Sequence, residues 1–346
     1  MLKISPDSKI YVHAPGDYST GGIELLHQLV DFLRQNGREA YIVYYGKNTY
    51  KILPTFSCYN ISIKQEEEVE DSNKNIEVYS ETYTKALKQN NRKTQKLIWW
   101  LSVDNYYKAN ELSLGVYDMA VWNWPYAWGI IKHRAKMMLK HHQNEFTNTV
   151  SVLEFVRRGF TFACQCAYIK HFLRRFGVLH PVSLSDYINT EFSENINIEQ
   201  KEDIVLYNPS KGYEFTKRLI DAAPDIKWVA LKGFAREELV EILKRAKIYI
   251  DFGNHPGKDR LPRECAMNGC CIITGMRGAA AYYEDIPIPQ TYKFNEKKVQ
   301  IKDIIKKIRD TLENYDTVIN DFIFYREKIK GEKHIFEEEI RGLFDC

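Results

Sequence analysis

Several chemical signatures are missing from this sequence, and each absence excludes a class of protein. No apolar run approaches the roughly 18 residues that a helix needs to cross a bilayer, so we expect a protein that is soluble or at most peripheral to a membrane. The first 16 residues lack the apolar core of a secretory signal, and this favours a cytoplasmic location. No Gly-x-Gly-x-x-Gly opens either half of the chain, which argues against a dinucleotide oxidoreductase.

Cysteine and charge usage argue against further classes. Seven cysteines form no even-numbered framework, which indicates reduced thiols rather than a disulfide-rich secreted protein. The net charge is +3, from 49 basic and 46 acidic residues, and this balance argues against a nucleic-acid partner. In the basic stretch over residues 132–142 the order of residues is not HExxH, and no cysteine–histidine spacing there matches a zinc site.

What is present is the composition of a globular protein. Hydrophobic residues make up 44% and charged residues 27% of 346 residues, and this length favours two domains. Strand-like and helix-like segments alternate through the first half, stop in residues 187–202, and then start again. We therefore expect a domain over residues 1–186, a linker over 187–202, a second domain over 203–317 and a helical tail over 318–346.

The same alternation predicts the fold class. Apolar runs predict strands at Lys9–Ala14, Ala40–Tyr45, Ile76–Val78, Leu97–Val103, Asp118–Trp122, Phe160–Cys166, Asp203–Tyr207, Trp228–Leu231, Lys247–Asp251 and Cys270–Thr274. Helical spacing predicts helices between them, for example Tyr213–Ala223, Arg236–Arg245 and Leu261–Asn268. Strand–helix–strand units build parallel sheets, so we expect an α/β protein with two Rossmann-like, doubly wound domains facing a cleft.

The stretch from Ile248 to Gly278 predicts one strand–helix–strand unit with a binding loop. An apolar run ends at Phe252-Gly253, a polar loop follows, and a helical segment leads through Gly269 into a second buried strand. Parallel sheets bind ligands beyond the carboxyl ends of their strands, so this loop is a candidate site. Its polar side chains are His255, Lys258, Asp259 and Arg260, with Glu264 in the helix that follows.

The glycine pair Gly21-Gly22 is a second candidate. It stands at the start of a predicted helix, where exposed backbone N–H groups and the helix dipole favour an anion. A plain tight turn would use the same residues, and the sequence leaves both interpretations open.

Tryptophan is concentrated in one region, since five of the six tryptophans fall between Trp99 and Trp128. Trp99 and Trp100 fit the core of a predicted strand, whereas Trp124 and Trp128 lie in a loop with proline and glycine, where aromatic rings suit sugars. The basic stretch over residues 132–142 predicts either a solvated helix face or a contact with an anionic membrane surface or polyanionic acceptor.

Four motifs follow one another in an informative order. Gly21-Gly22 opens the first helix, Asn208-Pro-Ser-Lys-Gly212 follows the first strand of the second half, Gly233 precedes Arg236-Glu-Glu-Leu, and Pro262-Arg-Glu-Cys-Ala-Met-Asn-Gly269 comes last. This order resembles the GT-B glycosyltransferases, in particular the retaining family 4, group 1 enzymes such as glycogen synthases and bacterial mannosyltransferases. The resemblance spans most of the chain. It implies transfer of a sugar from a nucleotide-diphosphate sugar to a glycan or lipid-linked acceptor, as in polysaccharide biosynthesis.

The resemblance also implies roles for single residues. The lysine of the family's Lys-Gly pair contacts the donor diphosphate and matches Lys211, and the family's ribose-binding glutamate matches Glu264. Lys211 and Arg260 are the residues expected to stabilise the leaving diphosphate during catalysis. The residues expected at the donor nucleotide are Gly21, Gly22, Asn208, Lys211, Gly253, Lys258 and Glu264.

Two departures from the family pattern concern the donor sugar. The family often has a second glutamate eight residues before the ribose-binding one, but Pro256 stands there in this chain. The family's histidine after a central strand of the first domain is replaced by the Asn123-Trp124 region. Any of His255, Asp259 and Arg260 could supply the missing glutamate's contacts, and the sequence leaves this open. The residues expected at the donor sugar or acceptor are His255, Asp259, Asn123 and Trp124.

Metal-dependent glycosyltransferases of the other major fold hold their ion with an Asp-x-Asp motif, which this sequence lacks, so we expect no metal and no other cofactor. The resemblance further implies that the anomeric configuration is retained. Two other functions stay open from the sequence. A nucleotide-sugar epimerase of related architecture would change its sugar without an acceptor, and a non-catalytic partner subunit would bind a sugar nucleotide without turnover.

Overall fold

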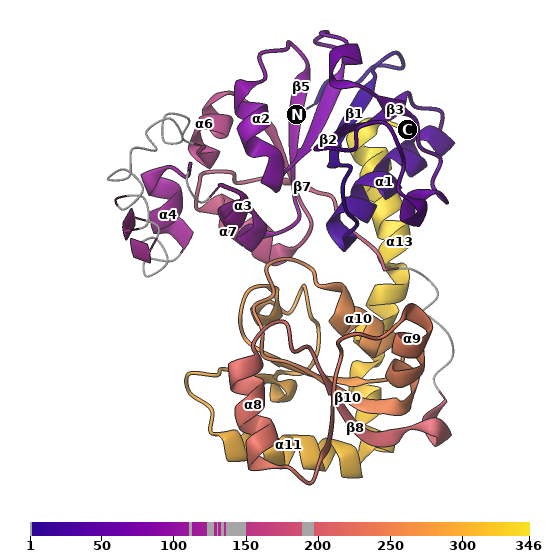
Figure 1. Ribbon diagram of the computed structural model, residues 1–346, viewed down its shortest axis with the longest axis vertical. Helices are drawn as coiled ribbons and strands as arrows, with labels where there is room; N and C mark the ends of the chain where they lie inside the picture. Colours follow the sequence, from indigo (N-terminus) through magenta and orange to yellow (C-terminus); the bar gives the residue numbers. More distant parts are fainter. Residues whose placement is uncertain are drawn as a thin grey trace. The chain divides into compact units, whose positions relative to one another are not determined.

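A computed structural model of the chain describes residues 2–110, 113–122, 128–129, 131–132, 135, 150–188 and 197–346. They form two compact units (Figure 1). Unit 1 consists of Met1–Gln165, Ile169–Leu184 and Glu337–Cys346, and unit 2 consists of Cys166–Tyr168 and Ser185–Phe336. The domain limits expected from the sequence stay a prediction.

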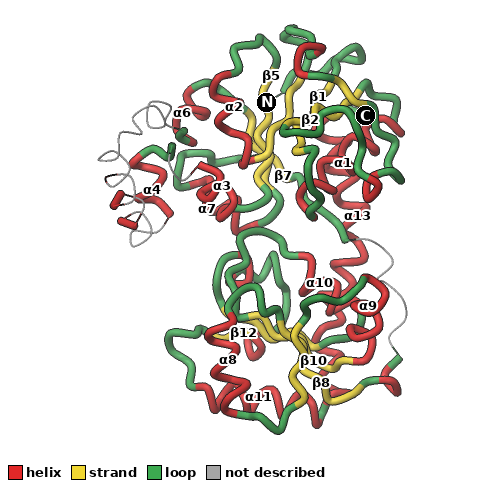
Figure 2. The backbone as a smooth tube through the Cα atoms, in the orientation of Figure 1, coloured by secondary structure: helices red, strands yellow, loops and turns green. Residues whose placement is uncertain are grey.

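Unit 1 is built on a parallel sheet of seven strands in the order β3-β2-β1-β4-β5-β6-β7 (Figure 2). The strands are β1 (Ile10–Pro15), β2 (Ala40–Tyr45), β3 (Ile63–Lys64), β4 (Ile76–Ser80), β5 (Gln95–Trp100), β6 (Thr161–Cys164) and β7 (Val182–Ser183). The chain leaves β1 toward β2 and leaves β4 toward β5. The carboxyl ends of β1 and β4 therefore form the topological switch point of this sheet, where doubly wound proteins place ligands.

The helices of unit 1 whose bounds lie in the described residues include α1 (Gly21–Gln35), α2 (Thr84–Gln89), α3 (Val103–Asn110), α4 (Val116–Trp122) and α6 (Val152–Arg157). Helix α1 has capping residues at both ends and the helical spacing of apolar residues that predicted it from the sequence. The Thr20 hydroxyl accepts a hydrogen bond from the backbone N–H of Ile23, which caps the start of α1, and Gly37 follows its end with a φ of 79°. Leucines at helical spacing then bury one face against the sheet.

Unit 2 contains a second parallel sheet, in the order β12-β11-β10-β8-β9. Its strands are β8 (Glu202–Tyr207), β9 (Lys227–Ala230), β10 (Ala246–Asp251), β11 (Cys271–Gly275) and β12 (Lys293–Phe294). Its helices are α8 (Tyr213–Ala222), α9 (Arg236–Arg245), α10 (Arg260–Met267), α11 (Ile301–Glu313) and α12 (Tyr315–Val318). Two further helices, α7 (Ala167–Arg174) and α13 (Ile323–Phe344), contain residues of both units.

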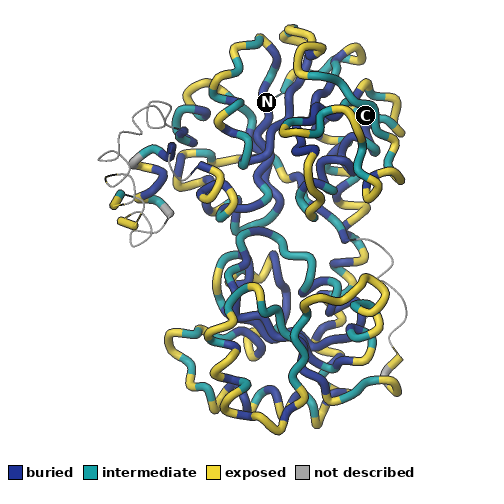
Figure 3. The backbone as a smooth tube through the Cα atoms, viewed as in Figure 1, coloured by how far each residue is buried: buried dark blue, intermediate teal, exposed yellow. Residues whose placement is uncertain are grey.

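The cores of both units follow their sheets, and the buried segments in Figure 3 run along the strands. Ile248, Tyr249 and Ile250 of β10 are all fully buried. Consecutive buried residues mean that both faces of the sheet are covered, and this is why the strands appear in the sequence as continuous apolar runs. Trp99 and Trp100 are likewise fully buried in β5, which confirms their assignment to the core.

One predicted strand is wrong, because residues 118–122 lie in helix α4. An apolar run of five residues fits a strand and a helix equally well. Tertiary contacts decide here: the buried carboxylate of Asp118 accepts hydrogen bonds from the Tyr106 hydroxyl at 2.7 Å, the Ser151 hydroxyl at 2.6 Å and the Val152 N–H at 2.9 Å. These hydrogen bonds connect α4 to α3 and to the start of α6. The periodicity of apolar residues in the sequence does not predict such contacts. In a smaller difference, β5 ends at Trp100, whereas the predicted strand extends to Val103.

Within the described residues, no helix combines the length and the apolar character that crossing a membrane requires. All seven cysteines lie in the described part of the chain, and none of them forms a disulfide.

Candidate functional site

The carboxyl ends of β8 and β10 form the topological switch point of unit 2. The two strands pair in parallel, and the chain leaves β8 toward β9 on one side, while β10 and β11 lie on the other. Connections that diverge in this way leave a crevice at the carboxyl edge, where doubly wound sheets bind ligands. Lys211 and Gly212 follow β8 at this edge, and Gly253 follows β10.

Gly212 and Gly253 allow the two loops to come very close together. The φ of Gly212 is +65°, and a Cβ there would lie 2.5 Å from the backbone nitrogen of Gly253. A Cβ on Gly253 would lie 2.6 Å from the Cγ of Lys211. A side chain at either position would clash. The glycines of the pairs Lys211-Gly212 and Phe252-Gly253 therefore allow Lys211 to lie over the end of β10.

The side chain of Lys211 lies among two carboxylates and a histidine, which we call the Lys211 cluster: Lys211, Asp251, His255 and Asp259. The ammonium is 3.1 Å from Asp251 Oδ2 and also forms a hydrogen-bonded ion pair with Asp259. His255 lies between the carboxylates, with Nδ1 3.0 Å from Asp259 Oδ2 and Nε2 3.6 Å from Asp251 Oδ1. The side chains of Asp251 and His255 are fully buried. The cluster therefore fixes the position of one cation at the carboxyl edge of the sheet.

Backbone contacts hold His255 in this place. Its carbonyl accepts a hydrogen bond from the Ala279 N–H at 2.8 Å, in the loop after β11. Gly278, with a φ of +61°, permits the approach, because a Cβ there would lie 2.0 Å from the same carbonyl oxygen. Asp251 is fixed in turn by hydrogen bonds from the Tyr249 hydroxyl at 2.8 Å and the Gly253 N–H at 2.9 Å.

The charges of the cluster shift the pKa values of its members. Burial on its own would lower the pKa of the Lys211 ammonium, but the charges of Asp251 and Asp259 outweigh burial and raise this pKa. Burial would raise the pKa of Asp259, but a hydrogen bond and charge from His255 together with Lys211 lower it to about 2. Lys211 thus keeps its charge, and Asp259 stays ionised, throughout the physiological pH range.

The same residues have the chemistry of a metal site. Asp251, His255 and Asp259 each offer a ligand atom, and these atoms lie within 4.8 Å of one another. Carboxylate and imidazole ligands would suit a divalent cation. However, the Lys211 ammonium already lies against both carboxylates, so these residues fit the one cation that the chain itself provides. The independence from metal expected from the sequence stays a prediction.

A pocket of about 620 Å³ opens at the first turn of α8, directly after Lys211 and Gly212. Its lining residues are Gly212, Tyr213, Glu214, Phe215, Met276, Arg277, Asn295, Glu296 and Lys297. The N–H groups of the first turn of a helix have no partners within the helix, and together with the dipole they favour an anion. Arg277 closes the opposite side, where it pairs with Glu296 at 2.9 Å and donates to the carbonyl of Phe252.

Lys258, Arg260 and Glu264 lie outside the Lys211 cluster. Lys258 forms ion pairs with Asp186 at 3.4 Å and Glu332 at 2.9 Å, and its side chain is only 11% exposed. Arg260 begins α10, and Glu264 lies half-buried within it. To contact a phosphate, Lys258 would have to break its ion pairs with the buried carboxylates of Asp186 and Glu332. The roles expected of Lys258, Arg260 and Glu264 stay predictions.

Arg263, which the sequence did not single out, is the centre of that second group of charges. Its guanidinium contacts Asp186 and Glu332, each at 2.6 Å, and the side chain is 1% exposed. Two carboxylates 146 positions apart thus share one buried cation on α10, which fixes the helix that carries Glu264.

The other expected residues are distributed as follows. Gly21 and Gly22 begin α1 in unit 1, where a Cβ on Gly22 would make ordinary contact with Leu101 at 3.4 Å. The side-chain oxygen of Asn208 accepts a hydrogen bond from the Ser210 N–H at 2.9 Å and so shapes the turn before Lys211. Asn123 and Trp124 lie outside the described residues.

Three residues of the unit 2 site were missed in the sequence. Asp251 could have been found, because it is a carboxylate at the end of a predicted buried strand. Arg277 and Glu296 follow β11 and β12, and β12 is too short, at two residues, to be recognised from its pattern.

Unit 1 has its own buried carboxylate at its switch point. Glu81 follows β4 directly, is 2% exposed, and accepts a hydrogen bond from the Leu101 N–H at 2.9 Å. Burial raises the pKa of this carboxyl to about 7.

The fold of this chain has counterparts among solved structures, although its sequence matches no protein-family model and no curated protein sequence. Among solved structures, HepE of Anabaena in complex with UDP-glucose matches with a TM-score of 0.58 and 7% identity, covering 98% of this chain and 100% of HepE. Sucrose-phosphate synthase from Thermosynechococcus elongatus matches with a TM-score of 0.59 and 11% identity, covering 98% of both chains. The chain has the GT-B fold.

The GT-B fold agrees with the two parallel sheets described above and confirms the predicted fold class. TarM also matches, with a TM-score of 0.51 and 13% identity, covering 81% of this chain and 57% of TarM. At such identities a match shows the fold alone, and the same GT-B fold carries different specificities. The function therefore depends on the residues of the site.

Proposed function

We propose that this chain is a glycosyltransferase that moves a sugar from a nucleotide-diphosphate sugar to a hydroxyl group of a glycan or lipid-linked acceptor. The position of Lys211 carries the proposal. Its ammonium is fixed at the switch point between β8 and β10. The chain continues from Lys211 through Gly212 into the first turn of α8, which lines a pocket of about 620 Å³. Pockets that hold small ligands measure about 300–1,000 Å³, so a nucleotide has room there.

The chemistry fits the charge that develops in such a transfer. As the sugar leaves its donor, negative charge builds up on the departing diphosphate, and fixed donors that face this charge lower the barrier. Lys211 supplies a full positive charge, and the free N–H groups at the start of α8 supply partial charges. The resemblance noted from the sequence adds Glu264 as the ribose ligand.

The finer features of the reaction belong to the same proposal. Retention of the anomeric configuration is supported by the resemblance to the family 4, group 1 enzymes. Metal independence is supported by the absence of Asp-x-Asp from the sequence. It is also supported by the Lys211 ammonium, which forms ion pairs with Asp251 and Asp259, where a metal ion would otherwise bind. The HepE structure contains UDP-glucose, which makes uridine nucleotides the first donors to test.

The test begins with ligand choice. A thermal-shift screen of UDP, GDP, ADP, CMP and dTDP with their sugars should single out one base. A free ligand at about 100 times its dissociation constant stabilises a protein by about 2.7 kcal/mol. The selected donor is then incubated with a glycan acceptor mixture in the presence of a metal chelator, and release of the nucleotide and the linkage of the product are measured.

Lys211→Ala and Lys217→Ala form a matched pair for this assay. Lys217 lies on the same helix α8, but its side chain is 55% exposed and pairs with Asp221 at the surface. We expect Lys211→Ala to lower turnover about 100-fold, as for a lost oxyanion donor, and Lys217→Ala to leave it unchanged. Equal turnover in both variants would refute the assignment.

Product analysis without an acceptor separates the proposal from its alternatives. A changed donor sugar would indicate a nucleotide-sugar epimerase, and binding without any release of nucleotide would indicate a non-catalytic subunit. Either result would contradict the proposed transfer.

A further inference from the structure

Unit 1 contains a second pocket, of about 580 Å³, which the proposed function does not use. One wall comes from the segment around η2 (Glu66–Glu68) and Asp71, and the other from α2 and the loop that follows it. Its lining residues are Glu66, Asp71, Tyr79, Tyr83, Ala86, Gln89, Asn90, Asn91 and Arg92. Asp71 precedes β4, and residues 90–92 precede β5, so most of the polar lining lies toward the amino ends of these strands, away from the carboxyl edge where β1 and β4 diverge.

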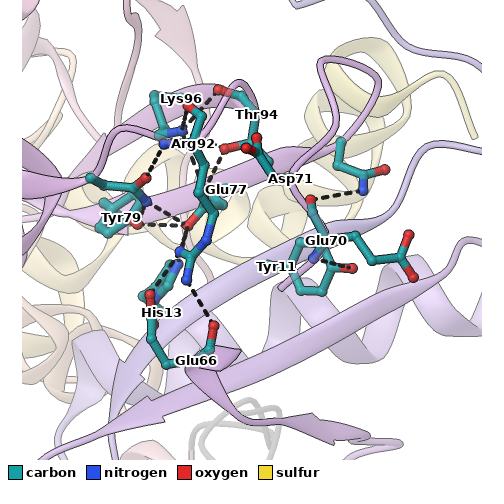
Figure 4. Close-up of polar contacts among 12 residues, drawn as sticks. Tyr11, His13, Glu66, Glu70, Asp71, Glu77, Tyr79, Arg92, Thr94 and Lys96 are labelled. Atoms are coloured by element: carbon teal, nitrogen blue, oxygen red, sulfur yellow. Dashed lines mark hydrogen bonds and ion pairs between the residues drawn. The ribbon is translucent and has the colours of Figure 1, made fainter. Parts of the chain in front are cut away.

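Beneath this pocket lies a buried group of charges around Glu77, shown in Figure 4 and called here the Glu77 network. Glu77 is fully buried, and its Oε2 accepts hydrogen bonds from His13 Nε2 at 2.9 Å, the Tyr79 hydroxyl at 2.7 Å and the Asn90 amide at 2.9 Å. Arg92 contacts the same oxygen at 3.2 Å. The other carboxylate oxygen accepts a hydrogen bond from Thr94 and lies 3.3 Å from the Lys96 ammonium.

These contacts hold the carboxylate ionised. Burial on its own would raise the pKa of Glu77, but the hydrogen bond and charge of His13, with further hydrogen bonds from Thr94 and Tyr79, lower it. A buried charge network adds little to stability compared with well-packed apolar residues, since its desolvation cost offsets most of its attraction. What the network provides is a fixed geometry, because six side chains contact the two oxygens of one buried carboxylate.

The geometry that is fixed is that of the pocket. Arg92 continues from Glu77 to the pocket wall, where it pairs with Glu66 Oε1 at 2.7 Å and donates to the Glu66 carbonyl at 2.7 Å. Asn90 donates to the Tyr79 hydroxyl at 2.6 Å, and its side-chain oxygen receives the Arg92 N–H at 2.8 Å. The two walls are thus joined through residues that also line the pocket. The positions of these lining residues are thus fixed before any ligand binds, as a binding site requires.

The lining also has a definite chemistry. Its lining contains the amides of Gln89, Asn90 and Asn91, the carboxylates of Glu66 and Asp71 and the Arg92 guanidinium, polar groups of the kind that bind the hydroxyl groups of a sugar. Tyr83 adds an aromatic ring to the lining, and stacking against Tyr45 holds this ring in place, with centroids 3.6 Å apart and 5° between the planes. Glu66 and Asp71 outnumber Arg92 in charge, and this disfavours an anionic ligand.

We propose that this pocket binds a neutral saccharide unit. The site goes beyond the proposed function, because binding here requires neither the donor nucleotide nor the transfer step, and it lies in the other unit of the chain from Lys211.

The experiment measures binding of defined neutral sugars to the full chain by saturation-transfer NMR and calorimetry. The probes are methyl glycosides of glucose, galactose, mannose and N-acetylglucosamine, and linear oligosaccharides of the same sugars. Methyl glucuronide serves as the anionic comparison. Binding of the single sugars would indicate a site for one sugar unit. Binding of the oligosaccharides alone would indicate a site for a longer neutral chain. Either result supports the proposal.

Variants then locate the binding. Asn91→Trp fills the pocket from an exposed residue that takes no part in the Glu77 network, and it should weaken binding at least tenfold with an unchanged melting temperature. Tyr83→Ala should also weaken it. Lys85→Ala, an exposed change on α2 outside the pocket lining, and Lys211→Ala should both leave it unchanged.

Three results would overturn the proposal: no neutral probe binds, the glucuronide binds more tightly than the neutral sugars, or Asn91→Trp binds as the unchanged chain does. Because Lys211→Ala should lower transfer about 100-fold while it preserves sugar binding, failure of this site and failure of the proposed function are distinguishable.

Discussion

Lys211 Nζ lies 3.1 Å from Asp251 Oδ2, so the lysine that follows the first strand of unit 2 is held by the carboxylate at the end of the third. The two residues come from loops that only glycine at 212 and 253 allows to approach so closely. In the proposed enzyme this pair positions the cation before any ligand arrives. Asp259 binds the same ammonium from the more exposed side, with 24% of its side chain accessible, and an arriving phosphate would compete with it.

We therefore expect Asp259→Asn to bind UDP more tightly, by about fivefold, because a negative charge near the phosphate is removed. The gain should shrink as salt is added, since the effect is electrostatic. Calorimetric titrations at low and high ionic strength measure both features. Asp221→Asn, an exposed change on α8, is the control and should have no effect. Weaker binding by Asp259→Asn would mean that this carboxylate helps the ligand instead of competing with it.

The approach of the two loops predicts a stability difference between glycines. Gly212→Ala places a Cβ 2.5 Å from backbone atoms of Phe252 and Gly253 at a φ of +65°, and the left-handed conformation alone costs about 1–2 kcal/mol. Gly331→Ala, in helix α13 with nothing within 4 Å of the new Cβ, should instead stabilise the chain by about 0.5–1 kcal/mol. Urea denaturation of both variants measures the change in the free energy of unfolding, which should be negative for Gly212→Ala and positive for Gly331→Ala. Unchanged stability in Gly212→Ala would show that the two loops can separate freely.

The buried charges around Arg263 predict a large loss on truncation. Arg263→Ala would leave the carboxylates of Asp186 and Glu332 buried without their main partner, and breaking such a pair costs about 3–5 kcal/mol. Arg309→Ala is the matched control, because Arg309 pairs with Asp225 at the surface, where both side chains are at least half exposed. Denaturation midpoints should fall strongly for the first variant and hardly move for the second. A similar small change in both would show that unit 2 relaxes around Arg263.

Glu81 predicts a pH dependence of stability in unit 1. Its pKa rises from 4.5 to about 7 on folding, so the unfolded chain releases this proton at lower pH than the folded chain does. The stability provided by the neutral carboxyl is complete below pH 4.5 and is lost as the pH rises through 7, by about 3 kcal/mol in total.

Glu81→Gln keeps an acceptor for the Leu101 N–H and carries no charge at any pH. We expect it to match the unchanged chain near pH 4 and to exceed it in free energy of unfolding at pH 8. Denaturation curves at several pH values measure this. Parallel pH profiles for the two chains would contradict a neutral Glu81.

Much of the fold could be predicted because its signals are local. Parallel strands buried on both faces produce continuous apolar runs, as at Ile248–Ile250, and amphipathic helices such as α9 produce a clear period, so both were found nearly to the residue. Helix α4 was mistaken for a strand because it depends on Asp118 and its partners on α3 and α6. Strands β3, β7 and β12 were missed because two residues are too few to show a pattern.

The site shows the same limit. Lys211 and Gly253 could be placed at a strand end from their neighbours in the chain, whereas the partners of Lys258 could not. Arg263 and Glu332, which share that group of charges, are 69 residues apart, and only the folded chain brings them together. The Glu77 network was missed for the same reason, because each of its members looked like an ordinary strand or loop residue.

The central claim, that Lys211 holds the diphosphate of the donor, is tested most directly by titrating UDP into the unchanged chain, Lys211→Ala and Lys217→Ala by calorimetry. Loss of the fixed ammonium should cost about 3 kcal/mol, which is on the order of a 100-fold weaker binding, whereas Lys217→Ala should bind normally. Equal affinity in all three chains, at a concentration where UDP does bind, would contradict the account.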